Sequence, residues 1–508
     1  MRVTIYQLPL APDQLSRRSR WVALAVLMLP VLLVSIDNTA LSFAVPSLSQ
    51  SLAPSGNQLL WIIDVYPLVL AALLVTMGSL GDRIGRRRIL LGGATGFAAV
   101  SVLAAFAPSA GWLIAARALL GIFGAMLMPA TVSLIRNIFT DAAERRTAIA
   151  IWMAGFSAGA ALGPVVGGWL LQHFWWGSIF LIAVPLLVPL LVLGPRLLPE
   201  SRDPDPGPVD PVGIVLVTVA LAASVFAIKS VATHGLDQLT VVAAAVGIAC
   251  GTAFVRRMLR RTNPMLDVRL FANPVFSVSL VVNLVSIFAL VGFIYFLAQH
   301  LQLIAGHSPL DAALMMVPGL VVTVVLGLGA VPMVRRFGVA RVMVAGVLLN
   351  AAGYAAVSVT GHTGSAAGLL IGFVLVCAGV GMSETVSNDL ALGAVPPAKA
   401  GAASAVSETA YEIGAVLGTA VLGSLLNLAY RQGVDVPVTV AGADAEHARA
   451  TLGGAVEVAQ GLPSASADAL LASAAQAFDS GVTLTAAIGS LLSLAVAFAA
   501  HRVLSSRV

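Results

Sequence analysis

The chemistry available to this sequence lies in a few carboxylates inside long apolar segments. Asp37 is the clearest of them, because Leu33, Val34, Ile36 and Leu41 surround it. An ionisable side chain in such a segment costs about 2.5–3.5 kcal/mol on insertion scales and is a functional candidate by default. Removal from water favours the neutral carboxyl group, so we expect Asp37 to take up and release a proton. The alternative is a structural acceptor of a hydrogen bond from a neighbouring helix.

A pair of carboxylates occurs in an apolar segment nearer the C-terminus. Glu408 and Glu412 are one helical turn apart and share a face, with Tyr411 beside them. Two carboxylates that close cannot both ionise cheaply in an apolar environment, so we expect the pair to retain a proton or to hold a cation. Hydrogen bonds to polar groups on facing helices are the alternative.

Three other acidic residues also lie in apolar segments. Asp64 is about two turns into its segment and could bind substrate or reach interfacial water. Glu384 and Asp389 lie in the inner part of a further segment, where Asp389 is expected to border the cytoplasm.

No pattern for a catalytic or metal centre accompanies these carboxylates. The sequence has no P-loop, nucleophile-elbow or HExxH pattern, so neither ATP drive nor hydrolytic catalysis is supported. His173, His300 and His307 have no metal-ligand spacing with another His, Cys or carboxylate. We therefore expect a protein that is not an enzyme and that holds no metal or other cofactor.

The carboxylates must be positioned by membrane-spanning helices. Of the 508 residues, 59% are hydrophobic and 10% are charged, with a mean hydropathy of +0.97. A soluble domain cannot hide that much apolar surface, whereas a bilayer accepts it.

The net charge of +5 does not indicate nucleic-acid binding, because the arginines form short clusters between apolar runs. Fourteen runs are long enough to span a bilayer: 21–45, 57–80, 89–107, 111–135, 147–171, 176–196, 211–232, 238–257, 275–299, 309–334, 339–360, 365–392, 402–430 and 481–503.

The basic residues predict the orientation of these spans. With the N-terminus in the cytoplasm, almost all of the 28 Lys and Arg residues fall on the cytoplasmic side. The exceptions are Arg117, within a span, and Lys229, Arg431 and Arg449, which are assigned to the outside. A miscounted span would place the later Lys and Arg residues outside. Since the cytoplasmic excess of basic residues continues to the C-terminus, it supports an even number of spans and cytoplasmic termini. We expect a multi-pass protein of the bacterial inner (plasma) membrane.

Two sequence patterns recur at an offset of eight spans. An Arg-x-Gly-x-x-Arg spacing follows span two at 83–88 and span ten at 336–341. A series of glycines occurs in span five at 155–163 and in span thirteen at 414–423. The common offset predicts two six-helix halves separated by two additional helices, an arrangement that many secondary transporters use. The predicted parts are a cytoplasmic segment at 1–20, an N-terminal half at 21–198, a linker with two spans at 199–274, and a C-terminal half at 275–508 that includes an external loop at 431–480.

The external loop 431–480 is acid-rich but contains Ala- and Val-rich stretches. We expect two short helices there, with a break near 461–463. The alternative is that the loop is a solvated spacer without a functional role.

The segment between spans two and three combines glycines with charge. Glycines let helix ends approach closely, and an acidic residue among arginines can form a charge network that latches an inner gate. Arginines that serve orientation alone would not explain the glycines or the acidic residue. The candidate gating residues are Gly78, Gly81, Asp82, Arg83, Gly85, Arg86 and Arg87.

Span five carries a face of small residues that ends in a proline. Packing alone could explain the glycines, but the proline predicts a bend at a moving interface. The residues of this segment are Gly155, Gly159, Gly163, Pro164, Gly167 and Gly168.

These segments resemble the major facilitator superfamily and, within it, the fourteen-helix drug:proton antiporters. The segment 78–88 resembles the signature loop between helices two and three, and 163–168 resembles the antiporter motif of helix five. Arg117 matches a helix-four motif whose arginine is implicated in proton handling, and 37–41 is similar to the helix-one motif of the fourteen-helix group. The resemblance covers essentially the whole chain.

The resemblance comes closest to efflux pumps for quaternary ammonium compounds, dyes and fluoroquinolones. In those pumps, acidic residues that match Asp37, Asp64, Glu408 and Glu412 are linked to proton or substrate handling. Some of them carry a further Asp in helix ten, where 318–321 has none. The resemblance therefore does not extend to divalent cations or to proton stoichiometry.

The expected function is proton-coupled efflux of lipophilic, mostly cationic compounds, in which proton and cation compete for the same carboxylates. The resemblance implies alternating access between the two halves, driven by the proton gradient. The expected partners are small lipophilic cations, protons and membrane lipids, without nucleic acid, and the protein is expected to be monomeric. The alternatives are a proton-coupled exporter of one endogenous metabolite, antibiotic or lipid, and a non-transporting sensor or scaffold.

Overall fold

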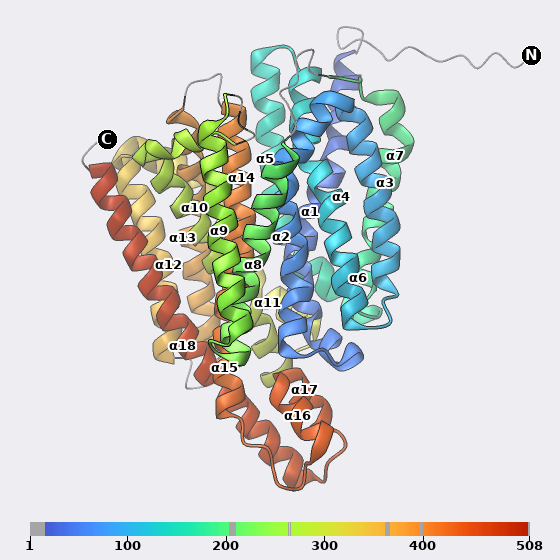
Figure 1. Ribbon diagram of the computed structural model, residues 1–508, viewed down its shortest axis with the longest axis vertical. Coiled ribbons are helices and arrows are strands. Elements are labelled where there is room, and N and C mark those ends of the chain that lie inside the picture. Colours follow the sequence, from blue (N-terminus) through green and yellow to red (C-terminus); the bar gives the residue numbers. More distant parts are fainter. Residues whose placement is uncertain are drawn as a thin grey trace, which may run out of the picture.

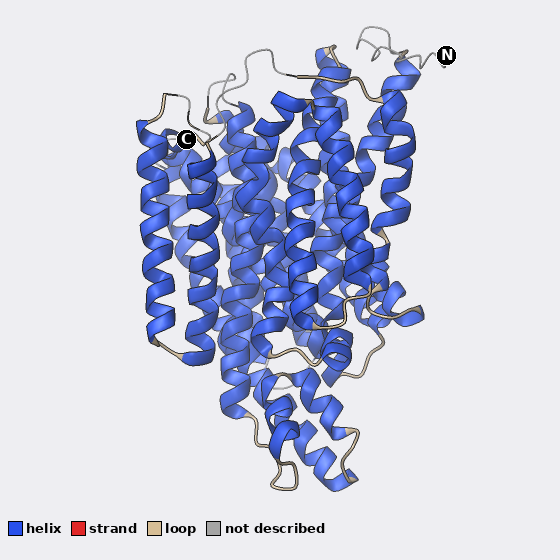
Figure 2. Ribbon diagram, turned by 45° about the vertical axis from the view of Figure 1, so that its right-hand side comes forward, coloured by secondary structure: helices blue, strands red, loops and turns tan. Residues whose placement is uncertain are grey.

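The structure, a computed structural model, describes residues 16–202, 210–262, 264, 266–360, 366–395 and 400–505. Every regular element within these ranges is a helix (Figure 2). In the described part of the chain, fourteen helical segments are long and apolar enough to cross a membrane, which confirms the predicted number of spans.

The helices follow one another along the chain with short connections. The N-terminal part contains α1 (Arg17–Leu52), α2 (Gly56–Ile84), α3 (Arg86–Ala105), α4 (Ala110–Ile138), α5 (Ala142–His173), α6 (Ser178–Leu181) and α7 (Ala183–Leu197). The middle part contains α8 (Pro211–His234), α9 (Gln238–Arg260) and the 3-10 helix η2 (Val268–Ala272). The C-terminal part contains α10 (Pro274–Gln299), the π-helix η3 (His300–Ile304), α11 (Pro309–Phe337), α12 (Val339–Thr360), α13 (Ala366–Gly393), α14 (Ala400–Leu417), the π-helix η6 (Gly418–Gly423), α15 (Ser424–Gly433), α16 (Gly442–Ala450), α17 (Leu452–Ala459) and α18 (Ser464–Ser505).

Local sequence explains where several of these helices begin. The side chains of Ser16, Ser55, Ser109 and Ser308 each accept a hydrogen bond from a backbone N–H three residues later. Such caps satisfy donors that have no partner within the first turn of a helix.

The helices form one bundle with two sides. In Figure 1, α1 to α7 lie on one side and α10, α12, α13 and α18 on the other, with the α8–α9 pair in front of the junction between them. The start of α1 and the end of α18 lie at the same end of the bundle, here called the termini end. The opposite end, from which α16 and α17 project, is called the loop end.

The linker helices α8 and α9 form a hairpin in which side-chain contacts join the two helices at both ends. At the termini end, Asp210 accepts hydrogen bonds from Arg257 at 2.8–3.0 Å and lies 3.4 Å from Arg261. The hydrogen-bonded Arg257 guanidinium holds the pKa of the Asp210 carboxyl below its ordinary value. At the loop end, the Thr240 hydroxyl donates to Ser230 at 2.7 Å. These contacts hold the two helices together as a unit.

The projecting loop is more helical than the sequence indicated. The expected break near 461–463 is present, between α17 and α18. The helix before it is interrupted at Thr451, however, and the helix after it continues without a break into the last span. The Tyr430 hydroxyl lies 2.8 Å from the Ala448 carbonyl oxygen and 3.2 Å from that of Thr451, and so attaches the loop to α15.

Glycines set the distance between the spans that carry the recurring pattern. A Cβ atom at Gly159 would lie 2.8 Å from Ser35 Cβ of α1. A Cβ atom at Gly414 would lie 2.5 Å from the Leu284 carbonyl oxygen of α10. In both halves the fifth span therefore packs on the first span through backbone that leaves no room for a side chain.

We expect Gly414→Ala to lower the melting temperature of the purified protein, because the added methyl group meets a backbone oxygen. Overpacking of this kind costs about 1–3 kcal/mol. Gly92→Ala in α3 is the matched control, since no atom lies within 4 Å of a Cβ there. Thermal unfolding in detergent compares them. Equal melting temperatures for the two variants would contradict the close-packing explanation.

Candidate functional site

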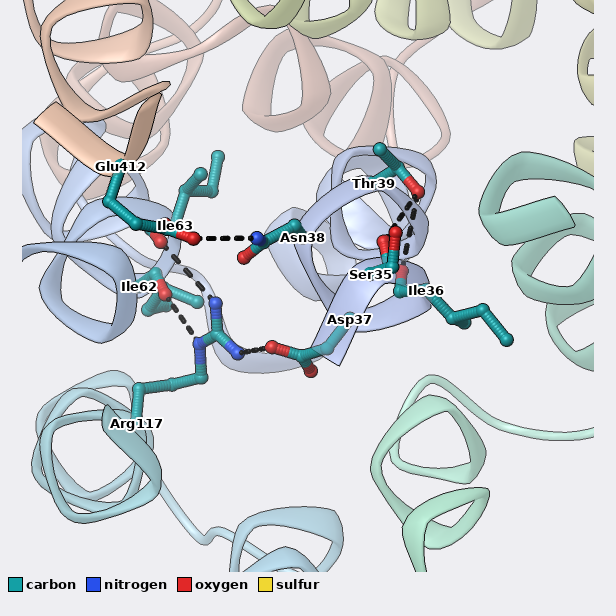
Figure 3. A network of polar contacts seen from close by, with 9 residues as sticks. All are labelled: Ser35, Ile36, Asp37, Asn38, Thr39, Ile62, Ile63, Arg117 and Glu412. Carbon is teal, nitrogen blue, oxygen red and sulfur yellow. Dashed lines mark hydrogen bonds and ion pairs between the residues drawn. The ribbon is translucent and has the colours of Figure 1, made fainter. Parts of the chain in front are cut away.

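Asp37 and Arg117 form a buried ion pair near the middle of the N-terminal half. Arg117 Nη1 lies 2.6 Å from Asp37 Oδ2, and both side chains are almost completely buried. The same guanidinium donates to the carbonyl oxygens of Ile62 at 3.1 Å and Ile63 at 3.4 Å (Figure 3). Its carbon lies 4.5 Å from the centre of the Tyr66 ring. One arginine of α4 thus connects α1 and α2.

The sequence of α2 and α4 explains why this arginine fits. Pro67 has no backbone N–H, so the carbonyl of Ile63 one turn earlier lacks its usual helical donor and can accept from Arg117. Gly121 of α4 brings the two helices together, because a Cβ atom there would lie 2.7 Å from the Tyr66 carbonyl oxygen.

The proline of α5 has a comparable effect on the contact with α1. Pro164 cannot donate to the Ala160 carbonyl, and the Thr39 hydroxyl donates to that oxygen instead, at 3.1 Å. Gly163 allows this approach, since a Cβ atom there would overlap Thr39. The segment 163–168 therefore joins α5 to the helix that carries Asp37.

One glycine of the same segment lies between the two halves. A Cβ atom at Gly168 would lie 2.6 Å from the Pro309 carbonyl oxygen and 3.0 Å from Ala313 Cβ, both in α11. The segment therefore reaches the interface between the two halves.

Asp64 is ion-paired with a residue of the linker. Lys229 of α8 places its Nζ 2.8 Å from Asp64 Oδ2, and both side chains are buried. The sequence assigned Lys229 to the basic residues outside the membrane. In the structure it lies within the span formed by α8, so this assignment is wrong. Asp64 is 0% exposed, which leaves no contact with interfacial water in this state.

Among the described residues, three carboxylates of the C-terminal half, Glu384, Glu408 and Glu412, have no such cationic partner. Glu412 of α14 is buried, and its Oε1 accepts a hydrogen bond from Asn38 of α1 at 3.5 Å. Glu408 interacts electrostatically with Glu412, and Glu384 of α13 with the Tyr411 side chain. Among the described residues, no ion pair involves Glu384, Glu408 or Glu412. Their charge can be balanced by protons or by a bound cation.

Aromatic rings lie beside these carboxylates. The Tyr411 ring meets the Phe156 ring of α5 edge to face, with centroids 5.4 Å apart. Trp152, one turn from Phe156, stacks on it at 6.4 Å. Aromatic faces next to acidic groups attract organic cations.

The two halves are hydrogen-bonded to each other in the middle and at the loop end of the bundle. Besides the Asn38–Glu412 contact, Gln302 donates to the Phe43 carbonyl at 3.3 Å and Asn427 to the Gly56 carbonyl at 3.4 Å. These hydrogen bonds hold the two halves together at the loop end.

The candidate gating segment forms part of the expected charge network. Asp82 binds Arg86 at 2.8–2.9 Å. The second acidic partner is Glu200, which accepts from the Arg87 backbone N–H at 3.1 Å and lies 3.8 Å from the Arg87 guanidinium. Gly85 between them has a φ of +116°, and a Cβ atom there would lie 2.5 Å from Glu200. The glycine is thus required by both its backbone conformation and its neighbour.

Sequence reasoning singled out most of these side chains but missed three partners. Lys229 could have been recognised as a lone cation within an apolar run. Asn38 is the neighbour of Asp37, and Glu200 follows span six, but neither carries a signal that identifies its distant partner. In the part of the chain that the structure describes, no three His, Cys, Asp or Glu residues are arranged to hold a metal ion.

Comparison with known proteins gives a consistent result. The family model of the Major Facilitator Superfamily matches residues 27–419. The multidrug efflux pump LfrA of Mycolicibacterium smegmatis is 56% identical over 477 residues, which cover 94% of this chain and 95% of that protein. The methyl viologen resistance protein SmvA of Salmonella typhimurium is 37% identical over 486 residues, covering 94% and 97%. A tetracenomycin C resistance and export protein of Streptomyces glaucescens is 32% identical over 411 residues, covering 80% and 76%.

Solved structures agree on the fold. A bacterial homologue of the human lysosomal transporter Spinster, in an inward-facing and unoccupied conformation, superposes with a TM-score of 0.67 at 19% identity, covering 97% of this chain and 98% of that chain. A D-xylose–proton symporter superposes with a TM-score of 0.59 at 15% identity, covering 93% and 97%.

Proposed function

Since this chain belongs to the Major Facilitator Superfamily and is a transporter rather than an enzyme, we propose that it is a proton-coupled multidrug efflux antiporter. Its substrates are lipophilic, mostly cationic compounds such as quaternary ammonium compounds and dyes, with fluoroquinolones as a further candidate class. It needs no cofactor, and it acts in the bacterial inner membrane as a monomer with both termini in the cytoplasm. Relatives named as efflux and resistance proteins support multidrug efflux.

The main observation in support of the proposal is that Glu384, Glu408 and Glu412 of the C-terminal half have no cationic partner among the described residues. Glu412 is buried between the halves, with Glu408 one turn away. A buried carboxylate without a counter-ion is costly unless it binds a proton or a cation. The two ligands compete for the same charge, so binding of one favours release of the other. That competition is sufficient to couple proton entry to drug exit.

The cycle follows from this competition and from the contacts between the halves. With cytoplasmic termini, the loop end faces outward, and in the proposed cycle substrate enters from the inside. A cationic drug then replaces the proton near Glu412, between the carboxylates and the rings of Phe156 and Tyr411. The halves rock, and protons from the outside displace the drug. Export of one cation per proton is electrically neutral.

Export of a single endogenous compound is the second candidate. The relative named for tetracenomycin C resistance and export favours it. Substrate breadth in everted membrane vesicles separates the candidates: transport of several unrelated cations supports the multidrug proposal, and transport of one compound alone supports the rival.

Ethidium efflux from cells that express the protein tests the coupling. We expect efflux to stop when a protonophore collapses the proton gradient while cellular ATP is maintained. Efflux that continues at an unchanged rate under these conditions would contradict proton coupling.

A further inference from the structure

The Lys229 ammonium group lies in surroundings suited to an organic cation. It is 2.8 Å from the Asp64 carboxylate and 4.1 Å from the centre of the Trp61 ring. Both residues belong to α2 and are three positions apart, which places them on one face of the helix. The side chain of Thr419, in the π-helix η6, lies near the same carboxylate. A carboxylate beside an aromatic face is the arrangement that binds ammonium groups in general.

This group of residues, Trp61, Asp64 and Thr419, lies where the halves and the linker meet. Trp61 and Asp64 come from the N-terminal half, Thr419 from the C-terminal half and Lys229 from the linker. Tyr295 of α10 also interacts electrostatically with Asp64. A change in the relative position of the two halves must therefore alter these surroundings.

Lys229 belongs to α8, a helix that is mostly not buried within the protein. The α8 helix contacts α2, α15 and η6, and an apolar stripe on it packs against α2 and the α14–η6 segment. The members of the stripe and their partners are Leu221, Ala222, Val225 and Ile228 against Leu68, Val416 and Ala420. Because α8 and α9 are tied to each other at both ends, the hairpin can withdraw as a unit and take the ammonium group with it.

A purely structural role would not require charge at this place. Burying two ions costs desolvation energy that their attraction only partly returns, and apolar residues of similar size often hold helices together as well or better. The apolar stripe on α8 already provides such contact. A buried charged pair is better suited to a position where one partner is exchanged.

We propose that Trp61, Asp64 and Thr419 form a binding site for the ammonium group of an organic cation, and that Lys229 is its tethered occupant. A substrate cation takes its place when the α8–α9 hairpin withdraws. The linker thereby controls specificity, because only cations that outcompete Lys229 enter. This inference rests on the proposed function for its substrate class, but the existence of the site does not depend on proton coupling.

Chemical rescue tests the site directly. Lys229→Ala removes the side chain beyond Cβ, and n-propylammonium replaces the missing atoms. We expect n-propylammonium to raise the melting temperature of purified Lys229→Ala in a saturable manner. It should have no such effect on the wild type, on Lys229→Arg, or on the Lys229→Ala/Asp64→Asn double variant. A rise in Lys229→Ala no larger than in the double variant overturns the proposal.

A second variant covers the case in which Lys229→Ala does not fold. Lys229→Met keeps most of the side-chain volume but has no charge. With both proteins measured at the same alkaline pH, we expect it to bind ethidium about tenfold more tightly than the wild type, since a buried carboxylate left without a partner gains one when a cation binds. Unchanged or weaker binding in folded protein overturns the proposal.

These binding measurements are independent of transport. If rescue succeeds but wild-type ethidium efflux does not depend on the proton gradient, the cation site stands and the proposed coupling fails. If efflux is proton-coupled but neither variant gains cation binding, the coupling stands and Lys229 is a structural counter-ion.

Discussion

Glu412→Gln is expected to reduce pH-driven ethidium efflux by at least about tenfold, which corresponds to about 1.4 kcal/mol. Glutamine keeps the size of the side chain and can still contact Asn38, but it neither exchanges a proton nor attracts a cation. Because Glu412 is buried and without an ionic partner in the described structure, its charge state depends on those two ligands. The measurement is the initial rate of efflux in everted vesicles at equal expression.

Glu446→Gln is the matched control for this substitution. Glu446 lies exposed in α16 of the projecting loop, away from the interface between the halves. We expect wild-type efflux from it. Glu408→Gln should have a smaller effect than Glu412→Gln, because Glu408 is only partly buried. A Glu412→Gln variant with wild-type pH-driven efflux would contradict the assigned role of this carboxylate.

Asp37→Asn is expected both to abolish coupled efflux and to destabilise the fold. The substitution leaves the buried Arg117 guanidinium without its carboxylate, and breaking a buried pair on one side costs about 3–5 kcal/mol. Arg117 also holds α2 through the carbonyl oxygens of Ile62 and Ile63, so the loss extends beyond one contact. Thermal unfolding in detergent, together with ethidium efflux, measures the two effects separately.

A double-mutant cycle separates pairing from proton handling. The variants are Asp37→Asn, Arg117→Gln and the combination of both. If the two residues act as a pair, the double variant recovers part of the melting temperature lost in Asp37→Asn, because no unpaired charge remains. Efflux should stay absent in all three. Additive losses of stability would show that the pair is not coupled, and wild-type efflux in Asp37→Asn would remove Asp37 from the mechanism.

The membrane spans could be predicted from the sequence because the bilayer imposes a simple rule on it. A span needs about 20 apolar residues, and each of the fourteen predicted runs corresponds to a helical span in the structure. Irregularities within spans were not predictable in the same way. The π-helix η6 within the run 402–430 and the division of span six into α6 and α7 preserve length and hydropathy. The apolar content of a run therefore does not predict a π-helix or a break within a span.

The ionisable residues were identified individually, but not their partners. An Asp within an apolar run is visible in the sequence, whereas its pairing depends on which helices pack together. Arg117 lies 80 positions from Asp37, and Glu412 lies 374 positions from Asn38. Lys229 shows the limit most clearly, because its place near the end of an apolar run assigned it to the outside, as an exception to the orientation rule. The ion pair with Asp64 makes its burial possible.

The central claim is that buried carboxylates exchange protons for cationic substrates across the membrane. The most direct measurement uses purified protein in liposomes with ethidium at equal concentration on both sides and an imposed pH gradient. Proton-coupled antiport predicts net accumulation of ethidium on the acidic side, against its own gradient, and no accumulation with Glu412→Gln. If wild-type protein only equilibrates ethidium, at a rate that the pH gradient does not change, the claim is contradicted.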